Sequence, residues 1–226
     1  MVRKDNEDSF LVSLDRGLFV VADGMGGHLA GQVASSLAVQ VIGEEYKLTA
    51  HCEPGQCLRE IVLKANAAIL SQGLQNPSYT GMGTTITAAV VRDNFVYLSH
   101  IGDSRAYLYR DGRLSQLTQD HSLVNELFKN GSISLEEMQK HPQKNILTSA
   151  AGTEAAPRID STIHTVRERD FLLLCTDGLH GHLTDRDIEL ILGENLSIGT
   201  KLNRLIGLAL ERGGADNITA ILVDIL

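Results

Sequence analysis

The sequence lacks tryptophan and is poor in other aromatic residues, with five phenylalanines and five tyrosines among 226 residues. No apolar run approaches the roughly 18 residues that a membrane-spanning helix requires, so no membrane segment is expected. No stretch concentrates lysine or arginine among aromatic residues, and the net charge is -8. A nucleic-acid-binding surface is therefore not expected either.

Cysteine is scarce, and its three copies are an odd number. Cys52 and Cys57 have four residues between them, and no second pair is present to complete a zinc site. Both are predicted to be ordinary thiols. Cys175 lies within an apolar run, where it is expected to act as a small buried hydrophobic residue.

Hydrophobic residues make up 43% of the chain and the mean hydropathy is -0.02, values typical of a soluble globular protein. The chain is long enough for a substantial core, and residues 1–226 are predicted to form a single domain. The first residues carry neither the apolar core of a signal peptide nor the arginine- and serine-rich pattern of a transit peptide. A cytoplasmic location is therefore expected.

The chain is organised around the apolar run Leu18–Ala22, which leads into Asp23-Gly24 and further glycines. We interpret it as a buried strand that ends in a metal-binding carboxylate. An Asp-Gly pair is also the commonest two-residue hairpin turn. Asp111-Gly112 has the pattern of such a turn, because apolar residues alternate on both sides of it. Asp23 is instead followed by the glycine-rich elbow Gly26–Gly31, which leads into a helical pattern.

Other acidic residues also stand next to apolar, strand-like runs. Asp177 follows Phe171–Thr176, Asp103 closes Val96–Gly102, Asp216 opens Asn217–Val223, and Glu7 and Asp8 precede Phe10–Val12. Carboxylates at strand ends would converge on one rim of a sheet core. Without compensation they would repel one another and take up protons, so the cluster implies bound cations. Ligation by oxygen alone indicates Mg2+ or Mn2+ rather than zinc.

Seven segments, taken in order, resemble the successive motifs of the metal-dependent protein phosphatases of the PPM (PP2C) family, bacterial type. They are Arg3–Ser9, Val21–His28, Gly83–Thr85, Gly102–Ala106, Asp120–Val124, Thr176–Leu179 and Gly214–Thr219. The resemblance runs from residue 3 to residue 219 and so covers essentially the whole chain. One such motif alone would be a weak signal, but all of them in the family's order are specific.

The resemblance implies a metal-dependent protein serine/threonine phosphatase, which hydrolyses phosphoserine and phosphothreonine with water activated by two Mg2+ or Mn2+ ions. The implied ligands are Asp23 as the bridge, Asp177 and Asp216 on the first ion, and Asp8 or Glu7 with the Gly24 carbonyl on the second. No covalent enzyme intermediate is then required.

Further roles also follow from the resemblance. Arg3 matches the family's phosphate-binding arginine, whose planar fork suits bidentate contact with a phosphoryl group. Asp103 matches a ligand of a third, weaker ion, with a structural role at a turn as the alternative. Met25 replaces the histidine that eukaryotic members carry just after the Asp-Gly, so His28 is either the general acid or a cap on the elbow.

The other histidines are not expected to be ligands. His180 and His182 are expected to be solvated or secondary, and structural positions are expected for His51, His100, His121, His141 and His164.

Hydrophobic periodicity predicts an α+β fold with helices outside two antiparallel sheets. Strands are expected over 10–14, 18–22, 84–91, 95–101, 105–109, 114–117, 158–166, 170–175 and 217–225. Helices are expected over 30–46, 57–72, 122–129, 134–140, after a Thr184 cap with Asp187 in a capping box, and over 198–211. The resemblance implies the same arrangement, a four-layer αββα sandwich of the PP2C type.

Residues 120–147 are interpreted as a mobile flap that selects substrates, because short helical pieces interrupt the strands there. Members of the family usually begin with a further strand before the arginine motif, whereas Met1 stands only two residues before Arg3. Either the amino end has been trimmed, or the chain does without that edge strand.

Rival functions fail on their motifs. A dinucleotide-binding loop would need a glycine where Leu29 stands, and the Gly-x-Ser-x-Gly elbow of serine hydrolases is absent. The remaining alternative is a noncatalytic phosphoprotein-binding or regulatory module of the same fold, against which the retained carboxylates argue. The expected partners are phosphorylated proteins and a serine/threonine protein kinase, without nucleic acid or membrane. Nothing argues for a dimer, so a monomer is expected.

Overall fold

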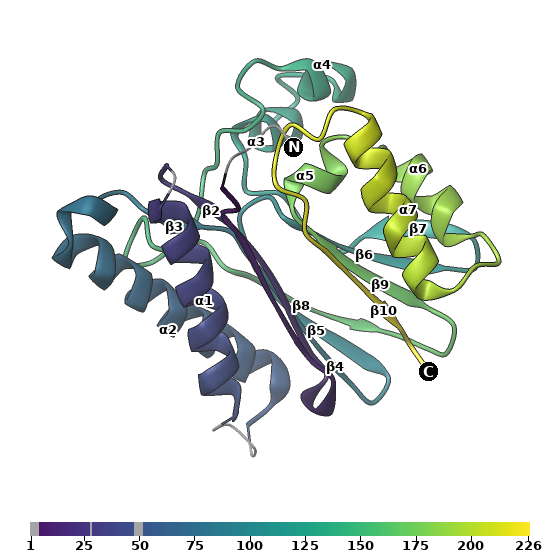
Figure 1. The fold of residues 1–226 in the computed structure, drawn as a ribbon, viewed down its shortest axis with the longest axis horizontal. Helices are drawn as coiled ribbons and strands as arrows, with labels where there is room; N and C mark the ends of the chain where they lie inside the picture. Colours follow the sequence, from purple (N-terminus) through teal and green to yellow (C-terminus); the bar gives the residue numbers. More distant parts are fainter. Residues whose placement is uncertain (1–4, 28, 48–51) are drawn as a thin grey trace.

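Two antiparallel sheets lie face to face in the middle of the molecule (Figure 1). The computed structural model of the chain describes residues 5–27, 29–47 and 52–226. Its strands are β1 (Asp8–Ser13), β2 (Leu18–Met25), β3 (Gly83–Thr84), β4 (Ile86–Arg92), β5 (Phe95–Ile101), β6 (Arg105–Arg110), β7 (Arg113–Gln116), β8 (Asp160–Thr165), β9 (Phe171–Cys175) and β10 (Ala220–Asp224). In these residues the larger sheet has the order β1-β2-β4-β5-β8 with β3 paired to β2, and the smaller sheet the order β10-β9-β6-β7.

Helices cover the outer face of each sheet. The helices of the described residues are α1 (Leu29–Lys47), α2 (Pro54–Gln75), α3 (Leu123–Lys129), α4 (Leu135–Lys140), α5 (Asp177–His180), α6 (Asp185–Leu192) and α7 (Ile198–Glu211), with 3-10 turns at Leu14–Arg16 and Pro77–Tyr79. α1 and α2 pack on the larger sheet, and α6 and α7 on the smaller (Figure 1). The predicted four-layer αββα sandwich is confirmed. Among the described residues, no helix has both the length and the hydropathy needed to cross a bilayer.

Strand β2 shows how the layers share their core. Leu18 and Val20 pack against α1 and α2, whereas Phe19 and Val21 pack between the two sheets. All four side chains are at most 4% exposed. Because side chains alternate along a strand, a strand that is buried on both faces reads as one continuous apolar run. This explains why the sequence shows no polar alternation before Asp23.

Two hairpins follow the predicted pattern. β1 and β2 turn through residues 14–17, where Gly17 has a φ of 60°. β6 and β7 turn through Asp111 and Gly112, whose φ values of 50° and 81° give the primed turn that an Asp-Gly pair favours. The first hairpin matters for function, because its register places Asp8 directly opposite Asp23.

Strand β2 does not end at Asp23, as the sequence suggested. It continues to Met25, and its last residues pair with β3. Thr85 lies between β3 and β4. Its N–H donates to the Asp23 carbonyl, and its hydroxyl accepts from the Asp23 N–H, both at 2.9 Å. Asp23 is therefore held by a partner segment that follows α2 in the chain, not by a turn of its own.

Several element boundaries also differ from the prediction. α2 begins at Pro54, because a proline in the first turn needs no backbone N–H partner and the Glu53 side chain accepts from the next two free N–H groups. β10 begins at Ala220 rather than at Asn217. The short helix α5 was not predicted at all.

The cysteine prediction holds for only one position. The structure joins Cys52 and Cys57 in a disulfide at the start of α2, so the prediction of ordinary thiols is wrong for this pair. Cys175 is a free cysteine, fully buried in β9 as predicted. Burial raises the pKa of its thiol to about 12, so the group stays protonated.

Residues 120–147 carry α3 and α4 between anchored ends. The Arg105 guanidinium donates three hydrogen bonds of 2.7–3.1 Å to the Asp120 carboxylate, and Ser122 bridges to Leu147. Ser122 caps α3, and Ser134 caps α4 through a capping box. The two predicted helical pieces are confirmed, and the role of the segment as a flap stays a prediction.

A pair of buried histidines lies beneath the start of this segment. The rings of His100 and His121 are 4.9 Å apart, and each is at most 1% exposed. The Nε2–H of His100 donates to the Gln119 carbonyl at 3.2 Å, so its Nδ1 accepts from the Thr87 hydroxyl at 2.9 Å. Burial first, and the neighbouring His121 second, lower the pKa of His100 to about 4, although Asp120 and Asp160 oppose the shift.

Replacing His100 with glutamine is expected to flatten the loss of stability in acid. The folded pKa of about 4 lies below the ordinary value of 6.5, so the unfolded chain binds more protons between these values and stability falls as the pH drops. One pKa unit corresponds to about 1.4 kcal/mol, so wild type loses about 2 kcal/mol from this group by pH 5. Urea unfolding of both proteins at pH 7.5 and pH 5 measures the difference. Equal losses in both would contradict the buried neutral ring.

Candidate metal centre

Carboxylates from both sheets meet at one end of the molecule. β1 and β2 place Asp8 opposite Asp23. Asp177 is the first residue of α5, directly beyond the end of β9. The Thr176 hydroxyl donates to Asp8 Oδ2 at 3.0 Å and so ties the end of β9 to the start of β1. The strand ends predicted to converge on one rim therefore do converge.

The carboxylates lie close enough together to perturb one another. The pKa of Asp23 is raised well above its usual range, first by burial and then by the charges of Asp177, Asp8 and Asp103. Burial raises the pKa of Asp8 to about 6, with Asp177 and Asp216 adding to the shift, and burial together with Asp177 raises that of Asp103 to about 8. The cluster is thus short of positive charge.

This shortage of positive charge indicates whether a metal ion suits the cluster. After burial, the charge of Asp177 contributes most to the raised pKa of Asp23, so the two carboxylates repel each other when both are ionised. In the described residues, no group of three or more histidine, cysteine, aspartate or glutamate side chains is arranged to hold an ion as it stands. A divalent cation would offset this repulsion, and hard oxygen donors suit Mg2+ or Mn2+. The donor chemistry of the clustered carboxylates therefore suits such an ion.

Glycines bring the backbone close around the same site. The Gly24 N–H donates to the Glu7 carbonyl at 3.1 Å, and a Cβ on Gly24 would lie 2.1 Å from the Gly31 carbonyl oxygen. A Cβ on Gly31 would in turn lie 2.0 Å from Glu7 Oε2. Only glycine permits this approach between β2, the start of α1 and the segment before β1.

Asp216 lies in the segment before β10, which is fastened to the residues before β1. The Asn217 side chain accepts from the Glu7 N–H at 2.9 Å and donates to the Asp5 carbonyl at 3.1 Å. The Asn217 carbonyl oxygen also packs so closely on α5 that a Cβ on Gly178 would lie 1.8 Å away. Asn217 thus links three segments of the site, a role that its place in the Gly214–Thr219 motif only hinted at.

Asp103 is half-buried and lies just beyond the end of β5, as predicted. His180 Nε2 donates to its carbonyl at 3.0 Å. Burial first, and Arg105 second, lower the pKa of His180 to about 3, so the ring is neutral. The expectation of a solvated or secondary His180 missed this contact, because it joins α5 to a residue far away in the sequence.

Arg3 and His28, expected to bind phosphate and to act as the acid, lie outside the described residues. The other predicted site residues form two groups. Asp8, Asp23, Asp103, Asp177 and Asp216 are linked through their charges, and Glu7 and Gly24 are linked to them through the backbone.

Known phosphatases resemble this chain in both sequence and structure. The family model for protein phosphatase 2C matches residues 3–223. The chain is 39% identical to the serine/threonine phosphatase stp of Listeria welshimeri, over 99% of this chain and 91% of that protein. The serine/threonine phosphatase of S. agalactiae superposes with a TM-score of 0.91 at 39% identity, over 99% of this chain and 95% of that one.

A second solved structure contains metal. It is the catalytic domain of the serine/threonine protein phosphatase PstP in complex with two manganese ions, and it superposes with a TM-score of 0.89 at 38% identity, over 100% of this chain and 94% of that one.

Proposed function

The chain belongs to the protein phosphatase 2C family and is a metal-dependent serine/threonine phosphatase, and on this premise we propose which of its residues hold the ions. The proposed ligands are Asp23 as the bridge, Asp177 and Asp216 on the first ion, and Asp8 or Glu7 with the Gly24 carbonyl on the second. Asp103 is proposed as a ligand of a third ion. When bound, Mg2+ or Mn2+ supplies the Lewis acidity for an in-line phosphoryl transfer to water.

The mutual repulsion of the carboxylates is the observation that carries this proposal. Their raised pKa values have no counterpart in a scaffold, where buried acids would be paired with arginine or lysine. Asp120 and Asp170 illustrate that alternative, because Arg105 and Arg110 neutralise them. In the cluster the carboxylates instead raise one another's pKa values, as for Asp8, Asp23 and Asp103, and this favours a cation. This argues against the noncatalytic module.

The chain's own residues have distinct proposed tasks. The β1-β2 pair and α5 hold the ligands on rigid elements, which fixes the spacing of the ions. Arg3 is proposed to bind the phosphoryl group, and His28 to protonate the leaving oxygen of serine or threonine. His180 is proposed as a positioning residue, because its Nε2 donates to the Asp103 carbonyl.

The proposed substrates are proteins that carry phosphoserine or phosphothreonine, with a serine/threonine kinase acting in opposition. The segment 120–147 is proposed to select among them, since it is anchored at its start through Arg105, two residues after Asp103 in the chain. A single domain, a cytoplasmic location and a monomeric state stay predictions.

Chelation is expected to abolish the release of phosphate from both p-nitrophenyl phosphate and a phosphothreonine peptide. Added Mn2+ or Mg2+ should restore it, because the carboxylates need positive charge to adopt their ligand positions. Phosphate release and thermal unfolding are measured before chelation, after it, and after each metal is added. Metal should also raise the melting temperature, since it binds only the folded site. A folded chain that releases no phosphate with metal present would favour the binding module.

A further inference from the structure

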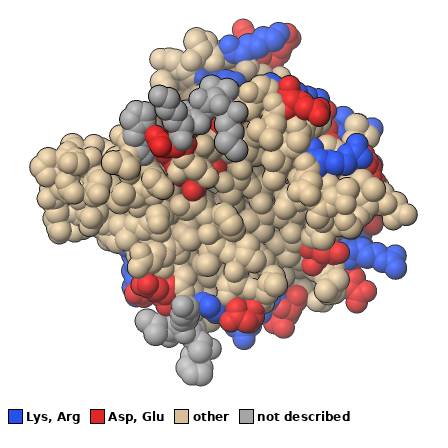
Figure 2. Space-filling model, in the orientation of Figure 1, with Lys and Arg blue, Asp and Glu red and all other residues tan. Residues whose placement is uncertain are grey.

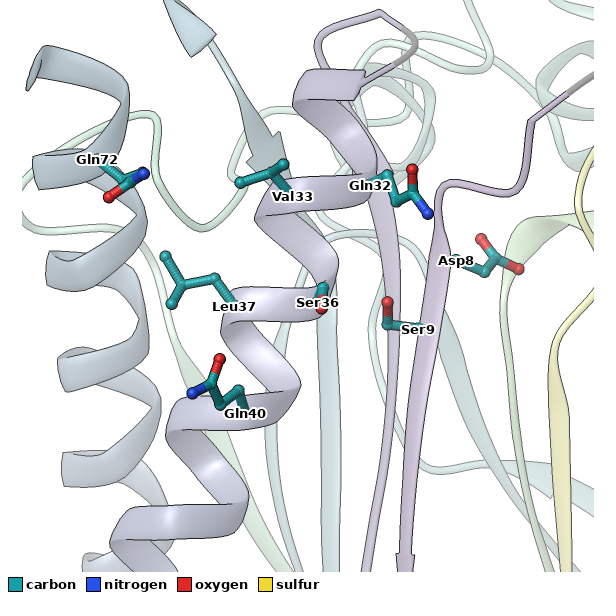
Figure 3. Close-up of a pocket in the computed structure, with 8 residues that line it drawn as sticks. All are labelled: Asp8, Ser9, Gln32, Val33, Ser36, Leu37, Gln40 and Gln72. Atoms are coloured by element: carbon teal, nitrogen blue, oxygen red, sulfur yellow. The ribbon is translucent and has the colours of Figure 1, made fainter. Parts of the chain in front are cut away.

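A cavity of about 420 Å³ lies next to the metal centre and extends along the exposed face of α1, between β1 and α2 (Figure 3). Asp8 lies on the β1 side near the carboxylate cluster, Gln32, Ser36 and Gln40 follow one another along α1, and Gln72 lies on the α2 side. Asp8 belongs to both the cavity and the proposed metal site. We call this cavity the α1 groove. A phosphorylated residue bound at the metals would therefore place its neighbours at the entrance of the groove.

The polar groups along the groove are free to bind a ligand. Gln32, Ser36 and Gln72 are exposed, and their side chains form no hydrogen bond with any other described residue. Gln40 bonds only to Glu44, one turn further along the same helix. Each glutamine side chain has an NH2 group that can donate and a carbonyl oxygen that can accept. These groups match the C=O and N–H of a peptide unit. The lining therefore suits the main chain of a peptide better than it suits an anion or a metal.

The spacing of the row on α1 matches an extended peptide. Gln32, Ser36 and Gln40 are four residues apart, which corresponds to about 6 Å along a helix. Alternate residues of an extended chain repeat at about 6.7 Å. The row spans about 12 Å, so it reaches roughly four residues of peptide. Ser35 fixes α1 beside β1, since its hydroxyl donates to the Glu7 carbonyl at 2.6 Å.

Apart from Asp8, the residues that line the groove carry no charge. Residues 29–43 and 65–91 contain no aspartate, glutamate, lysine or arginine, although the whole chain has 28 acidic and 20 basic residues. Figures 1 and 2 show these segments as an uncharged lobe on the side of α1 and α2. Away from Asp8, a charged peptide side chain would find no partner of opposite charge along the lining, and an acidic one would also face the carboxylate cluster. Uncharged flanking residues are therefore favoured.

We propose that the α1 groove binds an extended, uncharged stretch of the phosphoprotein next to the phosphorylated residue, with Gln32, Ser36 and Gln40 hydrogen-bonding to its main chain. This rests on the proposed function, because the substrate must be anchored at the metals. Sequence preference then comes from the lobe of α1 and α2 as well as from the segment 120–147.

The test compares two substrates. One is a phosphothreonine peptide with four uncharged residues on each side, and the other is p-nitrophenyl phosphate, which is too small to reach the groove when its phosphate is bound at the metals. In the double variant Gln32→Ala and Gln40→Ala, the ratio of kcat/KM for the peptide to that for the aryl phosphate is expected to fall about tenfold, as for the loss of two neutral hydrogen bonds. Alanine is a good helix former, so the melting temperature should hold. Gln56→Ala, an exposed glutamine at the opposite end of α2, should leave the ratio unchanged.

A charge placed in the groove gives an independent arm. Ser36→Arg is expected to raise kcat/KM for a peptide with glutamate flanks relative to the uncharged peptide, whereas Gln56→Arg adds the same charge elsewhere and should not. An unchanged ratio in both groove variants would overturn the proposal, even with normal metal-dependent release. Absence of release from either substrate by wild type would instead overturn the proposed function.

Discussion

Phosphate release is expected to fall about 10³-fold or more when Asp177 is replaced by asparagine, while the chain keeps its fold. The substitution removes one charge from the set proposed to hold the first ion. We expect this to remove about 4 kcal/mol of transition-state stabilisation, which corresponds to a factor of about 10³ in rate. Steady-state hydrolysis of p-nitrophenyl phosphate at saturating Mn2+ measures the loss.

The fold should stand because the charge of Asp177 is unfavourable in the metal-free protein. It raises the pKa values of Asp8, Asp23 and Asp103, which means that the three carboxyls are repelled when ionised. Asparagine has nearly the same shape and removes this repulsion. We therefore expect the metal-free variant to melt no lower than wild type, and its melting temperature to rise less when Mn2+ is added.

Asp93→Asn is the matched control. Asp93 is exposed in the turn between β4 and β5 and has a φ of 53°, a conformation that asparagine also tolerates. The variant loses the same charge far from the site and should keep both the activity and the thermal response to metal. Normal turnover by the Asp177 variant would rule out a metal-ligand role for this residue.

The parts of the fold that depend on local patterns could be predicted from the sequence. β5 and α7 begin and end where expected, because the apolar period is unambiguous and the flanking turns and caps are near in sequence. The positions of the carboxylates at strand ends could also be predicted from the sequence. It depends only on where each apolar run stops and on the antiparallel pairing of β1 with β2.

The parts that depend on distant partners could not be predicted in this way. β2 continues past Asp23 because Thr85 and β3 supply its partners, and nothing near Asp23 encodes them. His180 reaches Asp103 only when α5 meets the loop that follows β5 in the folded chain. The same limit applies to Asn217, although its neighbour Asp216 could be predicted as a metal ligand from its charge. Its own role lies in hydrogen bonds to residues at the other end of the chain.

Gly178→Ala is expected to cost both stability and activity, although alanine is normally the better residue in a helix. The propensity gain is about 1 kcal/mol. Against it, the new Cβ would lie 1.8 Å from the Asn217 carbonyl oxygen and 2.8 Å from its carbonyl carbon. Both atoms belong to the backbone and cannot rotate away. Overpacking of this kind costs about 3 kcal/mol or more, so the steric term wins.

The displaced segment carries Asp216 and the Asn217 bonds to Glu7 and Asp5, so the metal site moves with it. A shift of about 1 Å there would lower kcat about 10²-fold. The net loss of about 2 kcal/mol should lower the melting temperature by about 4–8 °C in a chain of this size. Differential scanning calorimetry and phosphopeptide hydrolysis on the same samples check both effects.

Gly207→Ala provides the matched comparison within the same layer of the fold. Gly207 lies in α7, and a Cβ there would meet no atom within 4 Å. Here only the propensity term acts, so the melting temperature should rise by about 2–4 °C with unchanged activity. Two glycine-to-alanine changes in helices then have opposite signs because of one backbone contact. If Gly178→Ala also stabilised the protein, Asn217 would not pack against α5 as described.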